Sequence, residues 1–334
     1  MIECAERVSV IICAYTADRW LELLAAVESV QHQTAPPDEI VVVIDHNPAL
    51  LAQARAHLPQ AIVIENHQPR GLSGARNSGL AIARGDIIAF MDEDAIAAPD
   101  WLAQLISHYA DPNVLGVGGT IEPVWGPAGL ADQPKWFPDE FAWVVGCTYR
   151  GLPETTRRVR NLIGCNMSLR RAVFQQIGGF RSGIGRVGKQ PVGCEETELC
   201  IRLNQHRPDC ALLYEPRSRV RHRVPHSRSS WRYFLARCYA EGASKALVAR
   251  FVGANDGLSS ERAYAVQTLP RGVARGVWEA IGQGDWAGLA RATAIVIGLL
   301  LTTAGFLIGR ARLGLFGRAT SEPPAKVLLE ESHI

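Results

Sequence analysis

The chain has 334 residues, of which 47% are hydrophobic and 20% charged, with a formal net charge of +2. The length allows one large domain or a domain with an appendage, and the balanced charge gives no support to a nucleic-acid partner. Eight cysteines without a Cys-x-x-Cys pair are typical of a reducing compartment, and the N-terminus lacks the layout of a signal peptide. We therefore expect the folded part to lie in the cytosol.

From Val8 to Gly119, short apolar runs alternate with segments of helical periodicity. Helices are predicted near 19–31 and 73–83. The strand candidates are Val8 to Ile12, Ile40 to Ile44, Ile62 to Ile64, and Ile87 to Phe90. They are almost entirely apolar, as expected when helices cover both faces of a sheet. The pattern predicts an α/β fold with a mostly parallel sheet covered by helices.

From about Thr120 to Arg160 the periodicity fades, and we expect a long ordered loop region over a site. It contains Trp125, Trp136 and Trp143, which either stack on sugar rings or pack in the core. Further along, helices are predicted at 171–177 and 195–204, and short strands at 211–214 and 219–223.

Beyond Trp231 the chain is predicted to be helical, with a charge-free apolar run at 292–309. This run has about the minimum length for a membrane span. A single span would place the arginines that follow it outside, against the positive-inside tendency, whereas an interfacial helix or a re-entrant hairpin would not. The amphipathic segment 270–282 could lie on the same surface. A buried C-terminal helix is the alternative to membrane association.

These changes in pattern divide the chain into three parts. We expect a catalytic domain over 1–230, a C-terminal helical, membrane-associated region over 231–318, and a polar tail over 319–334.

Candidate site residues follow or begin the predicted elements. Asp92 and Asp94 end a buried strand, where carboxylates can hold Mg²⁺ or Mn²⁺ beside a diphosphate; the alternative is a solvated acidic turn. Arg76 lies in the first turn of a helix, where it can pair with phosphate or remain an ordinary surface residue. Asp45 ends another strand and can accept a hydrogen bond from a base or ribose, or simply form a turn.

A second acidic cluster, Glu195 and Glu196, begins a helix. Crowded carboxylates raise the pKa of one of them, which suits a general base, although acidic residues also favour helix N-termini for structural reasons. His222 could be a metal ligand or a phosphate partner, or be purely structural. The stretch 217–237 contains seven arginines and no carboxylate, and it could face an anion.

Taken in order, these motifs resemble the family 2 glycosyltransferases of the GT-A fold. The resemblance covers about Val8 to His222. Its motifs are the opening strand before Tyr15, Asp45, the Gly-x-x-x-Ala-Arg-Asn-x-Gly run at 71–79, the Asp-x-Asp at 92–94, the Asn-Met-Ser-Leu-Arg-Arg at 166–171 with Gly-Gly-Phe at 178–180, and Glu195-Glu196. The resemblance implies an inverting transferase that requires Mn²⁺ or Mg²⁺.

It also implies roles for individual residues. Ala14, Tyr15 and Asp45 would hold the nucleoside of a nucleotide-sugar donor, and Arg76 would contact its nucleotide. Asp92 would lie at the ribose and the metal, Asp94 at the metal, and His222 at the metal or the diphosphate. Glu196, beside Glu195, would be the general base.

The chain departs from the family pattern at three places. Cys13-Ala14 replaces the usual Pro-Thr, His46 follows Asp45, and Glu196 replaces an aspartate. These departures fall mainly on the residues that would contact the base of the nucleotide.

We expect transfer of one sugar, because the Gln-x-x-Arg-Trp pattern of processive synthases is missing. A UDP-sugar is the favoured donor, and the acceptor would be a lipid-linked glycan, glycolipid or polysaccharide. The enzyme would act at the cytoplasmic face of the membrane as a peripheral, monotopic or single-span protein. A nucleotidyltransferase and a non-catalytic membrane-associated scaffold remain as alternatives.

Overall fold

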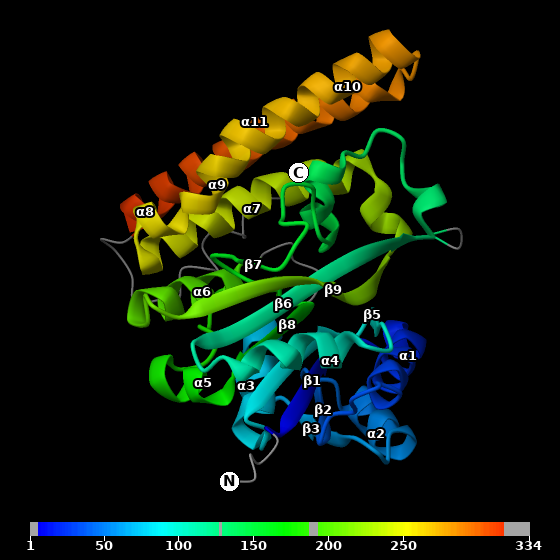
Figure 1. Ribbon diagram of the computed structural model, residues 1–334, viewed down its shortest axis with the longest axis vertical. Helices are drawn as coiled ribbons and strands as arrows, with labels where there is room; N and C mark the ends of the chain where they lie inside the picture. Colours follow the sequence, from blue (N-terminus) through cyan, green and yellow to red (C-terminus); the bar gives the residue numbers. More distant parts are fainter. Residues whose placement is uncertain (1–5, 127–128, 187–192, 317–334) are drawn as a thin grey trace.

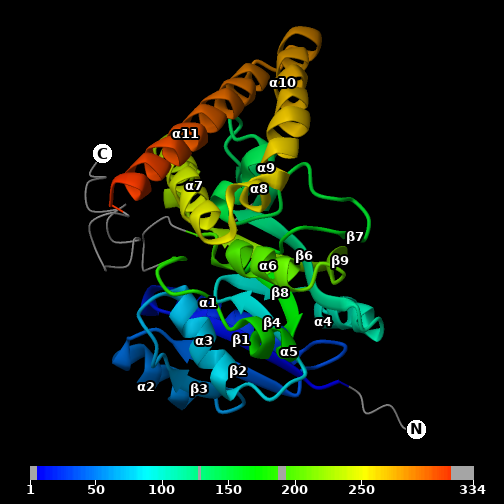
Figure 2. The same cartoon turned by 90° about the vertical axis from the view of Figure 1, so that its left-hand side faces the viewer.

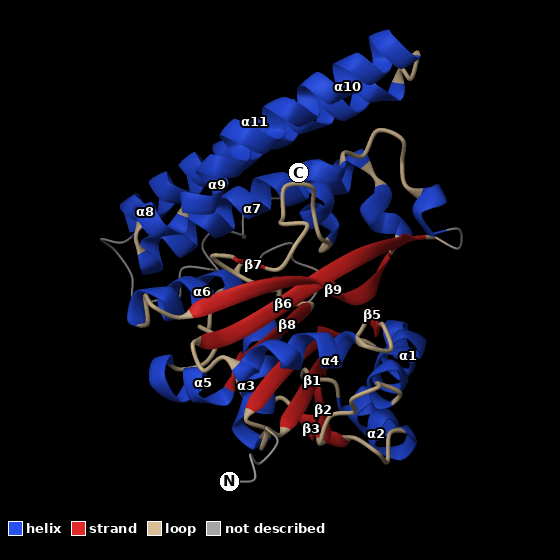
Figure 3. Ribbon diagram, in the orientation of Figure 1, coloured by secondary structure: helices blue, strands red, loops and turns tan. Residues whose placement is uncertain are grey.

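The computed structural model describes residues 6–126, 129–186 and 193–316, so the predicted tail at 319–334 lies outside the described residues. A nine-stranded sheet runs in the order β3-β2-β1-β4-β8-β6-β9-β5, and β7 pairs with β9. Figure 3 shows this sheet in red with helices around it. The strands are β1 Val8–Ala14, β2 Glu39–Ile44, β3 Ile62–Glu65, β4 Ile87–Asp92, β5 Ala95–Ala97, β6 Val114–Trp125, β7 Arg157–Arg158, β8 Asn166–Arg170 and β9 Ala211–Val224.

Helices flank the sheet and then form a separate layer at the C-terminal end of the described chain (Figure 1). The α-helices are α1 Trp20–Gln31, α2 Pro48–His57, α3 Leu72–Ile82, α4 Trp101–Ile106, α5 Arg171–Ile177, α6 Glu195–His206, α7 Trp231–Val252, α8 Ala254–Gly257, α9 Ser259–Ala263, α10 Leu269–Gln283 and α11 Ala287–Phe316. Short 3-10 turns lie at Ala17–Arg19, Ser107–Ala110, Gly129–Asp132, Asp139–Val145 and His226–Ser229, and a π-helical turn at Tyr264–Thr268.

The N-terminal half of the sheet is parallel, because β1 pairs in parallel with β2 and β4, and β2 with β3. Successive residues of β1 alternate between two cores: Val10 and Ile12 pack with α1, α2 and α4, while Ile11 packs with α3, α5 and α6. Helix α3 lies close to β1, since a Cβ on Gly79 would be 2.8 Å from a methyl carbon of Ile11. The α/β fold is thus confirmed, with both faces of the parallel part covered.

The sheet is mixed beyond β4. Strand β8 is antiparallel to both β4 and β6, and β6 pairs in parallel with β9. The prediction of a loop from Thr120 was wrong for its first residues, since β6 extends through Trp125. The two short strands predicted at 211–214 and 219–223 are one strand, β9, whose register shifts where Gly119 and Thr120 face it. Glycine and proline in these segments hid two long strands that bend.

Side chains at the starts of two helices explain where these begin. At α2, which the sequence pattern did not reveal, the Asn47 side chain accepts a hydrogen bond from the backbone N–H of Leu50, and Pro48 occupies the first turn. At α7, Ser230 accepts in the same way from Tyr233. The cysteines within the described ranges are free thiols and all are buried.

Helices α7, α10 and α11 form the layer farthest from β1 to β3, with α11 packed along α7 and against α10 (Figures 1 and 2). A Cβ on Gly242 of α7 would lie 2.0 Å from the carbonyl oxygen of Thr302, and one on Gly305 of α11 would lie 2.1 Å from that of Tyr239. Glycine therefore allows the two backbones to touch, and α11 is firmly seated on the rest of the protein.

One helix of the described residues is long and apolar enough to cross a membrane. It is the Ala287–Gly314 part of α11, with a mean hydropathy of 2.1 and one third of its most apolar window buried in the protein. The neighbouring α10 also exposes apolar side chains, including Trp278 at 60% and Ile281 at 78%. The amphipathic helix and the apolar helix predicted from the sequence are both present, and they lie side by side.

Candidate functional site

The carboxyl ends of three adjacent parallel strands meet at one edge of the sheet. Strand β1 ends at Ala14, β2 is followed by Asp45, and β4 ends at Asp92. Ligands of open α/β sheets bind at this edge. A cavity of about 470 Å³ lies there, and it is lined by every site residue that the sequence predicted: Ala14, Tyr15, Asp45, Arg76, Asp92, Asp94, Glu195, Glu196 and His222. The fold thus brings together residues from six separate segments.

The acidic triplet after β4 is embedded in charges of opposite sign. One guanidinium nitrogen of Arg19 lies 2.7 Å from Glu93 and 2.9 Å from Asp94. The other Asp94 oxygen is 3.2 Å from Nε2 of His222. Burial alone would raise the pKa of Asp94, but His222 and Arg19 hold it below its ordinary value. Burial opposes the charge on His222 as well, yet Asp94 raises the pKa of His222 to about 10.

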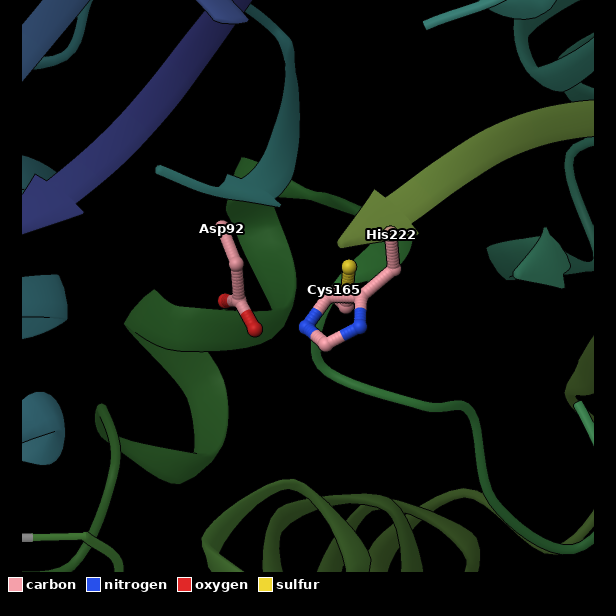
Figure 4. Close-up of side chains that lie close together, drawn as sticks. All are labelled: Asp92, Cys165 and His222. Atoms are coloured by element: carbon pink, nitrogen blue, oxygen red, sulfur yellow. The ribbon is translucent and has the colours of Figure 1, made fainter. Parts of the chain in front are cut away.

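The donor set around His222 fits a divalent cation. Asp94 and His222 are a hydrogen-bonded ion pair at 3.2 Å, so a cation at this place would have to replace the proton that they share. One ligand atom each from Asp92, Cys165 and His222 also lie within 4.8 Å of one another. Figure 4 shows these three side chains converging from different segments. Cys165, which the sequence did not single out, brings a sulfur to this group, but burial and the neighbouring Asp92 raise the pKa of its thiol, so the oxygen and nitrogen atoms are the stronger ligands.

Arg76 lies fully inside the protein and connects two of the motifs. Its guanidinium is 2.9 Å from Glu195, 3.5 Å from Asp92, and donates to the carbonyl oxygen of Gly164 at 3.1 Å. Arg76 therefore orients the end of β4 relative to the start of α6. Its predicted contact with a nucleotide stays a prediction.

The two glutamates at the start of α6 have different surroundings. Glu195 is buried and pairs with Arg76, and its second oxygen has no hydrogen-bond partner among the described residues. Glu196 is half-buried at the cavity. Burial and the neighbouring Glu195 raise the pKa of Glu196 to about 8, although Arg76 opposes this shift. A carboxyl group with this pKa is suited to accept a proton near neutral pH.

The predicted nucleoside end of the cavity is rigidly built. Asp45 accepts hydrogen bonds from the Asn66 side chain at 2.7 Å and from the backbone N–H of Gly71 at 3.0 Å. Gly71 precedes α3 with a φ of 123°, in the left-handed region that favours glycine. Asp45 thus fixes the entry to the helix that carries Arg76, and its contact with a nucleoside stays a prediction.

Comparison with protein families matches the model of Glycosyl transferase family 2 to residues 9–178, just over half of the chain. The chain belongs to this family. The match covers β1 to α5, including the acidic triplet, and ends before Glu196 and His222. It favours a glycosyltransferase over the nucleotidyltransferase and scaffold alternatives.

Curated relatives of this glycosyltransferase support the same conclusion. A glucosyl-dolichyl phosphate glucuronosyltransferase from Haloferax volcanii is 35% identical over 243 residues, which cover 72% of this chain and 76% of the relative. The succinoglycan biosynthesis protein ExoM from Rhizobium meliloti is 26% identical and covers 58% of each chain.

Among solved structures, a mannosyltransferase from Pyrobaculum calidifontis in complex with GDP-Man and Mn²⁺ is 20% identical to this glycosyltransferase, with a TM-score of 0.55. The match covers 94% of this chain and 88% of that structure. At this level of identity it establishes the fold, which is of the GT-A type.

The sequence pattern did not indicate Arg19 or Arg186, which line the cavity of this glycosyltransferase, whereas Arg228, which also lines it, belongs to the arginine-rich stretch predicted to face an anion. Burial and the neighbouring Arg228 lower the pKa of Arg186, so positive charge is concentrated there. The arginine-rich stretch 217–237 had been noted, but its inward and outward members were not separated. Residues of a strand alternate between faces, and in β9 the arginines near His222 are exposed while His222 is buried. That alternation separates the arginines of β9 from His222, but it gives no signal for Arg19, Arg186 or Arg228, which lie outside this strand.

Proposed function

We propose that this glycosyltransferase moves one sugar from a nucleotide-sugar to a hydroxyl of a lipid-linked glycan, with inversion at the anomeric carbon. The observation that carries the proposal is the convergence of a carboxylate–histidine pair and a high-pKa glutamate on one cavity. The first pair suits a metal-bound diphosphate, and the glutamate suits a base.

The donor would lie along the strand ends. Its nucleoside would contact Ala14, Tyr15 and Asp45, and its diphosphate would face Arg186 and Arg228, which concentrate positive charge in the cavity. These groups bind and orient the donor without taking part in proton transfer.

Glu196 would accept the proton from the acceptor hydroxyl. The oxygen then forms a bond to the anomeric carbon as the bond to the diphosphate breaks, and the electron pair leaves with the diphosphate. Attack and departure on opposite faces invert the configuration. Glu195 and Arg76 would hold Glu196 at a fixed distance from Asp92.

Asp92, Asp94 and His222 would hold the divalent ion, with Cys165 beside them. When bound, the ion supplies positive charge that stabilises the leaving diphosphate. His222 must lose its proton to become a ligand, so metal binding and proton release would be coupled. The mannosyltransferase structure contains Mn²⁺. A structure of GalNAc-T7 also contains Mn²⁺, and the match covers 48% of the GalNAc-T7 chain.

The acceptor would be carried by a membrane lipid. The relative from Haloferax volcanii acts on a glucosyl-dolichyl phosphate, and α11 of this chain is apolar enough to enter a bilayer. The active site would then face the membrane from its cytoplasmic side.

A thermal-shift screen with nucleoside diphosphates tests the donor class. We expect UDP to raise the melting temperature more than GDP or dTDP, and only when Mn²⁺ is present. Incubation of UDP-sugars with a glucosyl polyprenyl phosphate should then give a product one sugar larger. Stabilisation by none of the three nucleotides would contradict the donor assignment, and donor turnover without transfer to any lipid-linked acceptor would contradict the acceptor class.

A further inference from the structure

The cavity continues past Glu196 to the C-terminal helices. Its far part is lined by residues of α7, α9 and α11 in addition to the sheet domain. Cys194, which precedes α6, has its sulfur 3.3 Å from Glu241 of α7. Helix α7 therefore lies directly beside the proposed base, on the side away from the strand ends.

Five charged side chains form a continuous network in this far part. Arg237 lies 2.8 Å from Glu241, and Lys245 lies 3.4 Å from Glu241 and 2.6 Å from Glu261. Glu261 also pairs with Arg160 at 2.6 Å. All five line the cavity. The two carboxylates are each paired with basic side chains, and the three basic groups leave an excess of one positive charge. The oxygens and nitrogens of these groups can also exchange hydrogen bonds with hydroxyl groups.

Another part of the cavity wall belongs to α11, which packs against α7 and carries no charged residue here. Leu299, Thr302 and Phe306 line the cavity, while Leu300 and Leu307 on the same helix are 63% and 58% exposed. One side of α11 thus faces the cavity and another faces outward. Because Gly242 lets α7 touch α11, this wall has a fixed distance from Glu241 and Lys245.

We propose that this far part of the cavity is the acceptor subsite, in which Glu241, Lys245 and Glu261 bind the terminal sugar of a glycosyl polyprenyl phosphate while the first isoprene units lie along α11. The inference rests on the function proposed above. A displacement with inversion requires the acceptor hydroxyl on the face of the anomeric carbon opposite the diphosphate and within reach of the base. Helix α7 lies beside Glu196 on the side away from the strand ends, where such a hydroxyl could approach. The charged network suits the hydroxyl groups of the terminal sugar, and the apolar residues of α11 suit the isoprene units.

The test compares two isosteric or nearly isosteric variants, Glu241→Gln and Lys245→Met, with the wild type. The acceptors are a glucosyl polyprenyl phosphate and a glucosyl phosphate with a five-carbon chain. We expect the KM for both acceptors to rise at least tenfold in the variants, with UDP affinity in the presence of Mn²⁺ unchanged. A network that merely supports the fold would not separate acceptor KM from donor affinity.

The matched control is Glu279→Gln. Glu279 forms ion pairs with Arg275 and Arg291 on α10 and α11, away from the network. Its removal should leave both acceptor KM values unchanged. Ala265→Trp provides a second variant should the charge changes prevent folding, because Ala265 lines the cavity and the larger side chain would fill the acceptor space. It should raise acceptor KM without changing UDP affinity.

Unchanged acceptor KM in Glu241→Gln, Lys245→Met and Ala265→Trp would overturn the subsite while wild-type transfer still supported the function. The proposal would also be overturned if the variants weakened UDP binding as much as they raised the acceptor KM. That result would assign this part of the cavity to the donor. If the wild type hydrolyses a UDP-sugar but uses neither acceptor, the proposed function itself fails.

Discussion

The parallel half of the sheet and the C-terminal helices supply different kinds of residue to the same cavity. The parallel half supplies Asp45, Arg76 and Asp92 from strand ends and a helix start that follow one another in the sequence. The helices supply Glu241, Lys245 and Glu261, which pair with each other and with a loop far away in sequence. The first half, the proposed donor half, presents carboxylates and a guanidinium at the strand ends. The second, the proposed acceptor half, presents ion-paired side chains beside apolar residues of α11.

Position in the fold explains this difference. Strand ends converge wherever parallel strands are neighbours, so the donor half follows from topology alone. The acceptor half depends on how a later helix layer docks, and here docking depends on glycines at which α7 and α11 touch. Substitutions that damage one half and spare the other therefore test the comparison most directly.

The largest effect is expected at the boundary between the halves. Glu196→Gln should lower the turnover number for transfer by about 10²–10⁴-fold, because the amide cannot accept the acceptor proton. UDP affinity with Mn²⁺ should be retained, as measured by calorimetric titration. The neighbouring Glu195→Gln is the informative partner, since it removes the ion pair of Arg76 and should weaken both UDP binding and turnover. Full turnover by Glu196→Gln would show that another group is the base.

The sequence predicted the convergence of the strand-end residues on one cavity for the same topological reason, while their contacts with a donor stay a prediction. β1, β2 and β4 are continuous apolar runs, and Asp45 and Asp92 follow them directly, so their convergence required only the assumption of a parallel sheet. Cys165 escaped notice because it lies in no recognisable motif and meets Asp92 and His222 only in the folded chain.

The acceptor half was predicted only in outline. Helicity and apolar character of α10 and α11 were readable from periodicity, and their exposed faces agree with the amphipathic pattern. The pairing of Arg160 with Glu261 joins residues about a hundred positions apart, and no local pattern signals it. Of the three tryptophans considered for sugar stacking, Trp125 is buried in the core and Trp136 stacks on Trp231, while Trp143 lines the cavity. Core packing and site lining cannot be told apart from composition.

Separation of the two helices should damage the acceptor half more than the donor half. Gly242→Leu would force α7 and α11 apart, because even a Cβ would lie 2.0 Å from the carbonyl oxygen of Thr302. We expect the free energy of unfolding to fall by about 1–3 kcal/mol and transfer to fall more than Mn²⁺-dependent UDP-sugar hydrolysis. Gly314→Ala is the control, since a Cβ there meets open space and alanine favours a helix. Equal losses of hydrolysis and transfer would contradict the separation into halves.

The pH dependence of transfer reports on the interaction between the carboxyl groups of Glu195 and Glu196. Glu196 acts as a base only when it is deprotonated, and its pKa is raised to about 8 by burial and by Glu195. The rate should therefore rise about tenfold per pH unit below pH 8 and level off above it. In Glu195→Gln the like charge is gone, so the rising limb should move to lower pH. If the rising part of the pH–rate curve stays at the same pH in Glu195→Gln, the group that controls the rate is not Glu196.

The smallest effect is expected on the outer surface of the helix layer. Trp278 and Ile281 of α10 are 60% and 78% exposed, and a bilayer that covers such apolar side chains only in part gains a correspondingly small part of their full burial energy. The double variant Trp278→Ser, Ile281→Ser should sediment less with anionic vesicles and transfer more slowly to a vesicle-borne acceptor, with UDP affinity unchanged. Leu21→Ser is the matched control: Leu21 is 75% exposed but belongs to α1, on the donor half of the molecule (Figure 1). Ile281 and Leu21 are exposed to similar extents, 78% and 75%, so the single variant Ile281→Ser is the change that differs from Leu21→Ser mainly in location. Equal loss of vesicle binding in the two proteins would mean that contact with the membrane is not confined to the half that carries the acceptor subsite.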